Sequence, residues 1–186
     1  DRGAQGNGTT DDTAFINALI AAAPAGSVVR VPNGTYLLSQ SVILDKGIVL
    51  DGGPKEQVVF EFAEDGTYTE LGSSGTHAAI LLRHTLTNGG SADARRSVIR
   101  GITLIGNNAP NTHGIVLAAP ATLDHVDSKN FGLAGIATIA EVVDAGSAPI
   151  QGNANGSLFI NCIAQSNGAS GFYFLGNDSN ACTLLG

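Results

Sequence analysis

The sequence contains an internal repeat, and this feature limits what the chain can fold into more than any other. The segments SVIRGITLIGNN, ATLDHVDSKNFG and SLFINCIAQSNG, which begin at residues 97, 121 and 157, align without gaps. Shorter segments align in the same way: GIVL at 114–117, GIAT at 135–138 and GFYF at 171–174. Such units cannot bury their apolar faces alone and do so by stacking on one another. The repeat therefore predicts a solenoid of stacked β-coils.

The spacing of the aligned segments gives the length of one coil. Corresponding residues lie 24 and 36 residues apart in the long segments and 21 and 36 in the short ones, and Leu184 follows Phe159 by 25. We interpret 21–25 residues as one coil and the longer interval as a coil with an insertion. The sequence ends halfway through a coil. We therefore expect a fragment of a longer chain, in which further coils or another chain cover this end.

Three columns of the alignment carry structural information. Two are apolar, and the column between them holds residue types that tolerate a left-handed backbone. The apolar columns are Ile99, Leu123, Phe159 and Ile102, Val126, Cys162; the column between them is Gly101, His125, Asn161 and Gly186. This pattern predicts a sharp bend between two strands. His125 is interpreted as a bend residue in preference to a metal ligand or a general base.

The two cysteines occupy different positions in the coil. Cys162 lies in an apolar column, whereas Cys182 aligns with Ser157. Residues of neighbouring coils meet only when they share a column, and a disulfide needs close Cα atoms. We expect two free thiols, with Cys162 buried as a small apolar side chain.

The glycines at the start of the chain do not form a nucleotide-binding motif. Gly3, Gly6 and Gly8 have the reverse of the G-x-G-x-x-G spacing, and no Gly-Lys-Ser/Thr follows them. A short helix is predicted after them, because apolar residues recur at helical spacing and Pro24 and Gly26 end the run. The predicted apolar stripe consists of Phe15, Ala18, Leu19 and Ala22.

Side-chain oxygens precede this predicted helix. Thr10, Asp11 and Asp12 are expected to cap its first turn, where carboxylates also suit the helix dipole. The adjacent acids Asp11 and Asp12 have the alternative interpretation of a catalytic pair, which their position in the cap makes the weaker one.

The N-terminal third of the chain resembles a known superfamily. The run GAQGNGTTDDTAFINALIAA, followed by GSVVRVPNGTYLLSQSVIL and GIVLDGG, closely resembles the N-terminal signature of pectate-lyase-like β-helix proteins. That superfamily includes glycoside hydrolase family 28-like proteins, epimerase-like proteins and phage tailspikes. The resemblance is dense over residues 1–53 and rests on pattern alone beyond them. It implies an all-β, right-handed parallel β-helix whose N-terminal end is closed by the helix, and the tailspike relatives imply a homotrimer.

We therefore predict one β-helix domain over residues 1–186. Residues 1–30 form the cap region and residues 31–186 the stacked coils, with loop insertions at about 61–77, 85–97 and 141–156. Loops on such a scaffold usually carry recognition. The candidate ligand-binding residues in these loops are Tyr68, Glu70, Arg95, Arg96, Glu141 and Asp144. Carboxylates with an exposed aromatic ring suit a sugar ligand, although each single residue is more simply explained as a solvated loop charge.

Catalytic motifs of the superfamily are not found in this stretch. The Asn-Thr-Asp, Asp-Asp with Gly-His-Gly and Arg-x-Lys sets of family 28 hydrolases are missing, and the Thr-His-Gly at 112–114 is not equivalent to the epimerase Asp-Pro-His. The catalytic residues are therefore unknown. Asp124, Asp127 and Lys129 form a cluster too thin to support calcium, so no metal and no cofactor is predicted.

Charge and hydropathy exclude two classes of partner. The formal net charge is −7, and clustered Lys and Arg, which duplex nucleic acid and anionic membranes require, are missing. No apolar run reaches the roughly 18 residues of a membrane span. The favoured function is an extracellular or virion-surface module that engages polysaccharide, as tailspikes and adhesins do. The alternatives are a secreted polysaccharide lyase, hydrolase or epimerase whose catalytic coils lie beyond residue 186, and a purely structural shaft.

Overall fold

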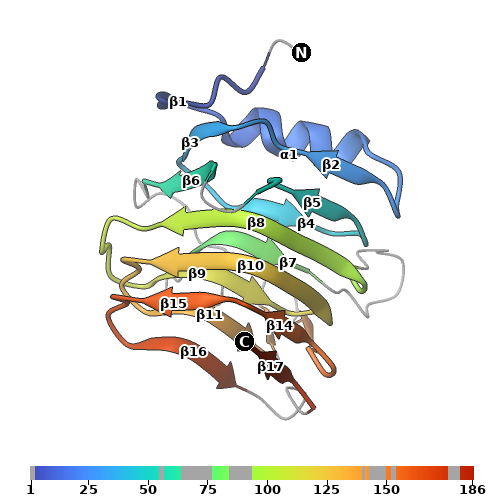
Figure 1. The fold of residues 1–186 in the computed structure, drawn as a ribbon, viewed down its shortest axis with the longest axis vertical. Coiled ribbons are helices and arrows are strands. Elements are labelled where there is room, and N and C mark those ends of the chain that lie inside the picture. Colours follow the sequence, from blue (N-terminus) through green and yellow to red (C-terminus); the bar gives the residue numbers. More distant parts are fainter. Residues whose placement is uncertain are drawn as a thin grey trace.

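The computed structural model describes residues 3–54, 57–63, 77–83, 94–139, 141–142, 150–151, 154–175 and 181–186. Within these ranges the chain forms one helix, α1 (Thr13–Ala22), and two large parallel sheets. Figure 1 shows the strands stacked in layers, with α1 across the N-terminal end and β17 near the opposite end. The three predicted insertions lie largely outside the described residues.

The first sheet follows the order β1-β3-β6-β8-β10-β14-β17, with β2, β5 and β15 paired beside this path. Its strands are β1 (Asn7–Asp11), β2 (Val28–Arg30), β3 (Gly34–Leu38), β5 (Val49–Asp51), β6 (Val58–Phe62), β8 (Ser97–Ile105), β10 (Ala121–Lys129), β14 (Leu158–Ile160), β15 (Ile163–Gln165) and β17 (Thr183–Leu185). The second sheet has the order β16-β11-β9-β7-β4. Its strands are β4 (Val42–Leu44), β7 (His77–Leu82), β9 (Thr112–Leu117), β11 (Ala134–Ile139) and β16 (Ser170–Leu175). A small antiparallel pair joins β12 (Glu141–Val142) to β13 (Ile150–Gln151).

The register of the strands confirms the repeat. Leu123 lies opposite both Ile99 and Phe159, and Phe159 lies opposite Leu184. In the second sheet, Ile136 lies opposite Ile115 and Phe172. Each coil thus supplies a strand to each sheet and pairs in parallel with the next coil. This is the parallel β-helix with an N-terminal helix that the sequence predicts.

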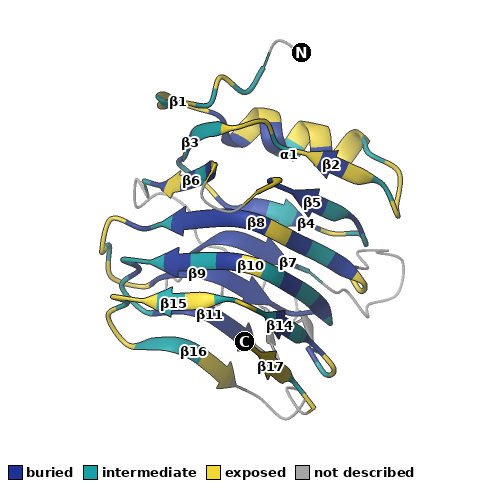
Figure 2. Ribbon diagram, viewed as in Figure 1, coloured by how far each residue is buried: buried dark blue, intermediate teal, exposed yellow. Residues whose placement is uncertain are grey.

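The interior is a continuous apolar stack. It consists mainly of Leu, Ile, Val and Phe side chains that point inward from both sheets, and Figure 2 shows that the central strands are the most buried. The strands β7 and β9 are buried along their whole length. A second apolar cluster lies outside the main core and contains Ala78, Leu81, Val116, Ala118, Ala134 and Ala137. The second sheet is therefore covered on both of its faces in this region.

The column between the two apolar columns has a left-handed backbone. The φ angles are +63° at Gly101, +52° at His125, +49° at Asn161 and +115° at Gly186. At Gly101, a Cβ atom would lie only 2.0 Å from the carbonyl oxygen of Gly53 in the preceding coil. The bend at this position therefore needs a glycine, whereas the later coils hold a histidine and an asparagine there.

The helix packs with a different face from the one predicted. Ile16 and Ile20 are buried together with Thr13, whereas Phe15 and Leu19 of the predicted stripe are exposed. Asn17 accounts for the difference. Its side-chain amide donates to the carbonyl oxygen of Ser41 (2.8 Å), and its Oδ1 accepts from the backbone N–H of Ile43 (2.8 Å). Because these bonds satisfy the free edge of β4, they orient the helix with Ile16 and Ile20 inward.

Of the three residues predicted to cap the helix, only Asp11 bonds to its first turn through its side chain. Asp11 accepts hydrogen bonds from the backbone N–H of Thr13 (3.0 Å) and from the hydroxyl of Ser39 (2.6 Å), so it ties the first turn of the helix to the residue that follows β3. Asp12 occupies the N-cap position but makes no side-chain capping bond. Its carboxylate instead accepts from the backbone of Gln5 and Gly6. Thr10 belongs to β1, not to the cap.

Both cysteines are free thiols, as predicted. Cys182 follows the register of Ser157, since Thr183 lies opposite Leu158. Cys162 is only half-buried, which corrects the expectation of a buried side chain.

Candidate ligand-binding site

The loop residues selected from the sequence do not assemble into one site within the described residues. Tyr68, Glu70 and Asp144 lie outside the described ranges. Glu141 is placed only by its backbone, in β12. The two arginines, Arg95 and Arg96, are exposed in the turn before β8, and Arg96 lines a shallow cleft of about 290 Å³ next to Pro120 and Gly156.

A row of charges on the outer face of the first sheet was missed by the sequence analysis. Strand register places Arg30 opposite Asp51, Asp51 opposite Arg100, and Arg100 opposite Asp124. We call these four residues the charge ladder. Arg100 donates to both carboxylate oxygens of Asp51, through Nε (3.0 Å) and Nη2 (2.9 Å), while Arg30 lies 3.9 Å from the same carboxylate. The signs alternate along the solenoid, so the ladder is neutralised within itself.

The bend residues continue this polar row. Nδ1 of His125 lies 2.6 Å from Oδ1 of Asp124, and Nδ2 of Asn161 lies 3.4 Å from Nε2 of His125. His125 therefore links a carboxylate in its own coil to an amide in the next one. Within the described ranges no group of three or more His, Cys, Asp or Glu side chains could hold a metal ion.

The charge ladder predicts a pH dependence of stability. Hydrogen bonds from Arg100 hold the pKa of Asp51 below its usual value, although burial opposes them. A lowered folded-state pKa stabilises the fold above the unfolded pKa of about 3.9 and loses this effect as the pH falls through the folded-state value. We expect Asp51→Asn to lower the free energy of unfolding by about 1 kcal/mol at pH 7. Denaturant unfolding from pH 7 to pH 2.5 should show this difference shrinking below about pH 4; a constant difference would contradict the assignment.

The second sheet carries a cavity of about 330 Å³ on its outer side, which we call the His113 cavity. It lies between β9, β11 and β16 and is lined by His113, Leu133, Ala134, Ala169, Ser170 and Tyr173. Parallel pairing brings the lining residues together, since Ala134 lies opposite Ser170. Tyr173 lies opposite Ala137, at the end of the outward row that also contains Leu81 and Val116. Tyr173 is 41% exposed.

His113 is held neutral in this cavity. It is only 5% exposed, and burial lowers its pKa to about 4. The backbone N–H of Ala134 donates to its Nδ1 (3.2 Å), so the ring proton lies on Nε2. Within the described part of the chain, His113 makes no other hydrogen bond. The result is a fixed N–H donor without an acceptor among the described residues.

The other polar side chains of the His113 cavity also lack partners among the described residues. Neither the hydroxyl of Ser170 nor the phenol of Tyr173 makes a hydrogen bond within these ranges. Donors, acceptors and one aromatic ring thus surround an otherwise apolar space, which is the usual make-up of a small-molecule site. The signal in the sequence was the uninterrupted apolar run after His113, which indicates a strand buried on both faces.

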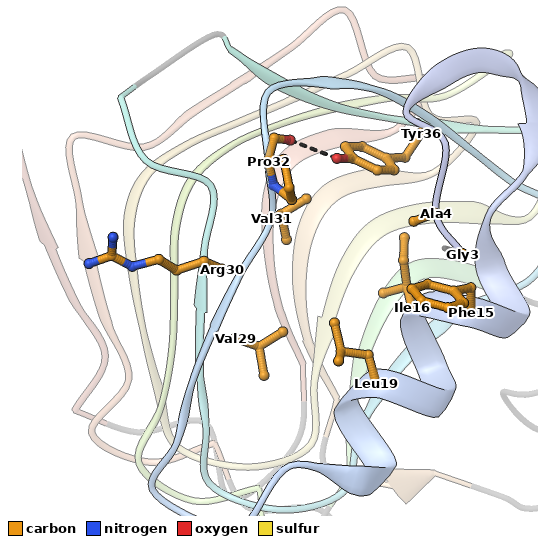
Figure 3. A pocket seen from close by; sticks show the side chains of 10 residues that line it. All are labelled: Gly3, Ala4, Phe15, Ile16, Leu19, Val29, Arg30, Val31, Pro32 and Tyr36. Carbon is orange, nitrogen blue, oxygen red and sulfur yellow. Dashed lines mark hydrogen bonds between the residues drawn. The ribbon is translucent and has the colours of Figure 1, made fainter. Parts of the chain in front are cut away.

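A second cavity, of about 420 Å³, lies under the capping helix. Figure 3 shows that Phe15 and Leu19 form one wall and Val29 the other, while the side chain of Arg30 points away. The phenol of Tyr36 already donates to the carbonyl oxygen of Pro32 (2.7 Å). This cavity therefore offers no free polar group from the described side chains that line it, and we assign it to the packing of the cap.

Comparison with known proteins agrees with the fold. A model of the family described as rhamnogalacturonase A/epimerase, pectate lyase-like, matches residues 1–182. Curated relatives include the pre-neck appendage proteins of Bacillus phages PZA and phi29, each 31% identical over 113 residues. The matched region is 61% of this chain and 12% of each relative, so the chain spans only a small part of their length.

Two solved structures share the architecture. The ORF18 protein of Geobacillus virus E2 has a TM-score of 0.63 at 18% identity, covering 97% of this chain and 38% of its own. The A-module of the mannuronan C-5 epimerase AlgE4 from Azotobacter vinelandii has a TM-score of 0.57 at 18% identity, covering 92% of this chain and 48% of its own. At this identity the likeness shows the fold alone.

The stacked parallel sheets and the capping helix define a pectate-lyase-like β-helix protein. The chain belongs to the rhamnogalacturonase A/epimerase, pectate lyase-like family. In the described part of the chain, no helix has both the length and the apolar character needed to cross a bilayer.

Proposed function

We propose that this chain is a polysaccharide-binding module of a phage appendage and that the His113 cavity is its binding site. One observation carries the proposal: three hydrogen-bonding groups, on His113, Ser170 and Tyr173, line a cavity on the outer side of the second sheet and have no partner for these groups among the described residues. An aromatic ring that packs on the apolar face of a sugar, beside groups that bond its hydroxyls, is suited to a glycan. The phage relatives support the assignment to a virion appendage.

One side of the proposed site is accessible to a long chain, although His113 itself is buried. Tyr173 lies at the surface, so a polymer could contact its ring without threading into the solenoid. Stacked coils repeat about every 4.8 Å, so adjacent coils present their side chains at regular intervals along the solenoid axis. This regularity supports binding of a linear polysaccharide across several coils. The homo-oligomer implied by the tailspike resemblance remains a prediction.

Screening on a glycan array tests this proposal. We expect Tyr173→Ala to weaken binding of any captured glycan about tenfold, because it removes the stacking ring. Leu19→Ala is the matched control: Leu19 is also exposed, at 45%, but lies on α1 at the other end of the solenoid, and its loss should leave affinity unchanged. Equal effects of the two substitutions would reject the site, and an empty array would favour a purely structural shaft.

An activity assay separates binding from catalysis by a lyase or a hydrolase. Incubation of the protein with acidic and neutral polysaccharides, followed by measurement of reducing ends and unsaturated products, should show no turnover by this chain. Products formed at a rate that depends on protein concentration would instead favour a polysaccharide lyase or hydrolase.

A further inference from the structure

We propose that the His113 cavity selects uncharged sugar units, such as hexoses or N-acetylhexosamines, and discriminates against uronates. This inference rests on the proposed function and names the class of sugar that the site accepts. It follows from the chemistry of the lining, in which the described residues supply hydrogen-bonding groups but no Lys or Arg.

The first step concerns the donor. His113 lines the cavity, and because its Nδ1 already accepts from the backbone N–H of Ala134, its ring proton is on Nε2. A neutral N–H donor bonds the hydroxyl or amide oxygen of a sugar well. It supplies no full positive charge to balance a carboxylate.

The groups packed around His113 do not favour a positive charge on the ring. The neighbouring strands place Ala78 of β7 and Ala134 of β11 opposite it, and β16 contributes Ser170 and Tyr173. None of these described side chains carries an acid that would stabilise an imidazolium. Burial therefore keeps the ring neutral, with its pKa at about 4.

The second step concerns the walls. Leu133, Ala134 and Ala169 make much of the lining apolar. A carboxylate that enters such a space loses its hydration shell, and this loss is costly unless a cation or several donors replace it. A hydroxyl or acetamido group loses much less and can bond to His113 and Ser170. The net charge of the chain, −7, also disfavours a polyanion.

The test compares matched ligands. Isothermal titration measures the affinity for a gluco-oligosaccharide and for its counterpart oxidised at C6 to the uronate. The two ligands differ in charge but have nearly the same shape. We expect the neutral ligand to bind at least tenfold more tightly at pH 7, with an affinity that is insensitive to salt and constant between pH 5.5 and 8. Tighter or equal binding of the uronate, or a steep loss of affinity with salt, would overturn the inference and leave the proposed function standing.

Two substitutions of His113 provide a second readout. His113→Gln retains an N–H donor of similar reach and should keep most of the preference for the neutral ligand. His113→Leu keeps the volume but removes the donor, and should weaken binding of the neutral ligand about tenfold. Circular dichroism checks that this variant is still folded. Equal affinity in both variants would overturn the role of the donor. If neither ligand binds and the glycan array is also empty, the proposed function fails together with this inference.

Discussion

Gly101→Ala should destabilise the protein by at least about 3 kcal/mol or prevent it from folding. Gly101 lies in the bend within β8 at φ +63°, where an L-residue is strained by about 1–2 kcal/mol on its own. The greater part of the effect comes from sterics, because the new Cβ would lie 2.0 Å from the carbonyl oxygen of Gly53. That oxygen belongs to the backbone of the neighbouring coil and cannot move without breaking the stack.

Gly53→Ala is the control for this prediction. Gly53 also has a positive φ, +75°, but nothing lies within 4 Å of a Cβ placed on it. It should therefore cost only the backbone strain, about 1–2 kcal/mol. Urea unfolding of both variants measures the difference. Similar losses at the two positions would show that the close approach between coils does not matter.

Phe60→Ala should lower the free energy of unfolding by about 3–5 kcal/mol. Phe60 is fully buried in β6, and its ring packs edge-on against Tyr36, with centroids 5.8 Å apart. It also stacks between two coils, since it lies opposite Tyr36 on one side and Leu104 on the other. Removing the ring leaves a cavity between the coils, because the closely packed neighbours cannot move in to fill it.

Phe60→Leu distinguishes the loss of volume from the loss of the aromatic pair. Leucine fills most of the space, so this variant should lose only about 1–2 kcal/mol. Thermal and urea unfolding of the two variants measure the contrast. A leucine variant as unstable as the alanine variant would mean that ring geometry, not volume, controls packing at this position.

The coils could be predicted from the sequence because the solenoid repeats its own chemistry. Ile99, Leu123 and Phe159 share a column, and the structure pairs them as the alignment does. The helix was also predictable, because apolar residues recur at helical spacing. Its buried face was not, because two apolar stripes were available. The choice between them depends on Asn17, which bonds to β4, a strand that is distant in the sequence.

The charge ladder and the His113 cavity could not be found by inspecting single segments. Arg30, Asp51 and Arg100 are separated by unequal stretches of sequence, and they become neighbours only once strand register is known. His113 was passed over because its Thr-His-Gly context matches no catalytic motif. It is recognised as a candidate by its burial and by an N–H without an acceptor among the described residues, which are properties of the folded chain and not of the local sequence.

The pairing of Leu123 with Ile99 and with Phe159 has a consequence for how such a protein can change over evolutionary time. The first pair is 24 residues apart and the second 36, yet both occupy equivalent positions in the sheet. The strand pairing is thus the same whether 24 or 36 residues separate the paired positions. Insertions between coils can therefore accumulate in such a protein while the stacked strands keep their register.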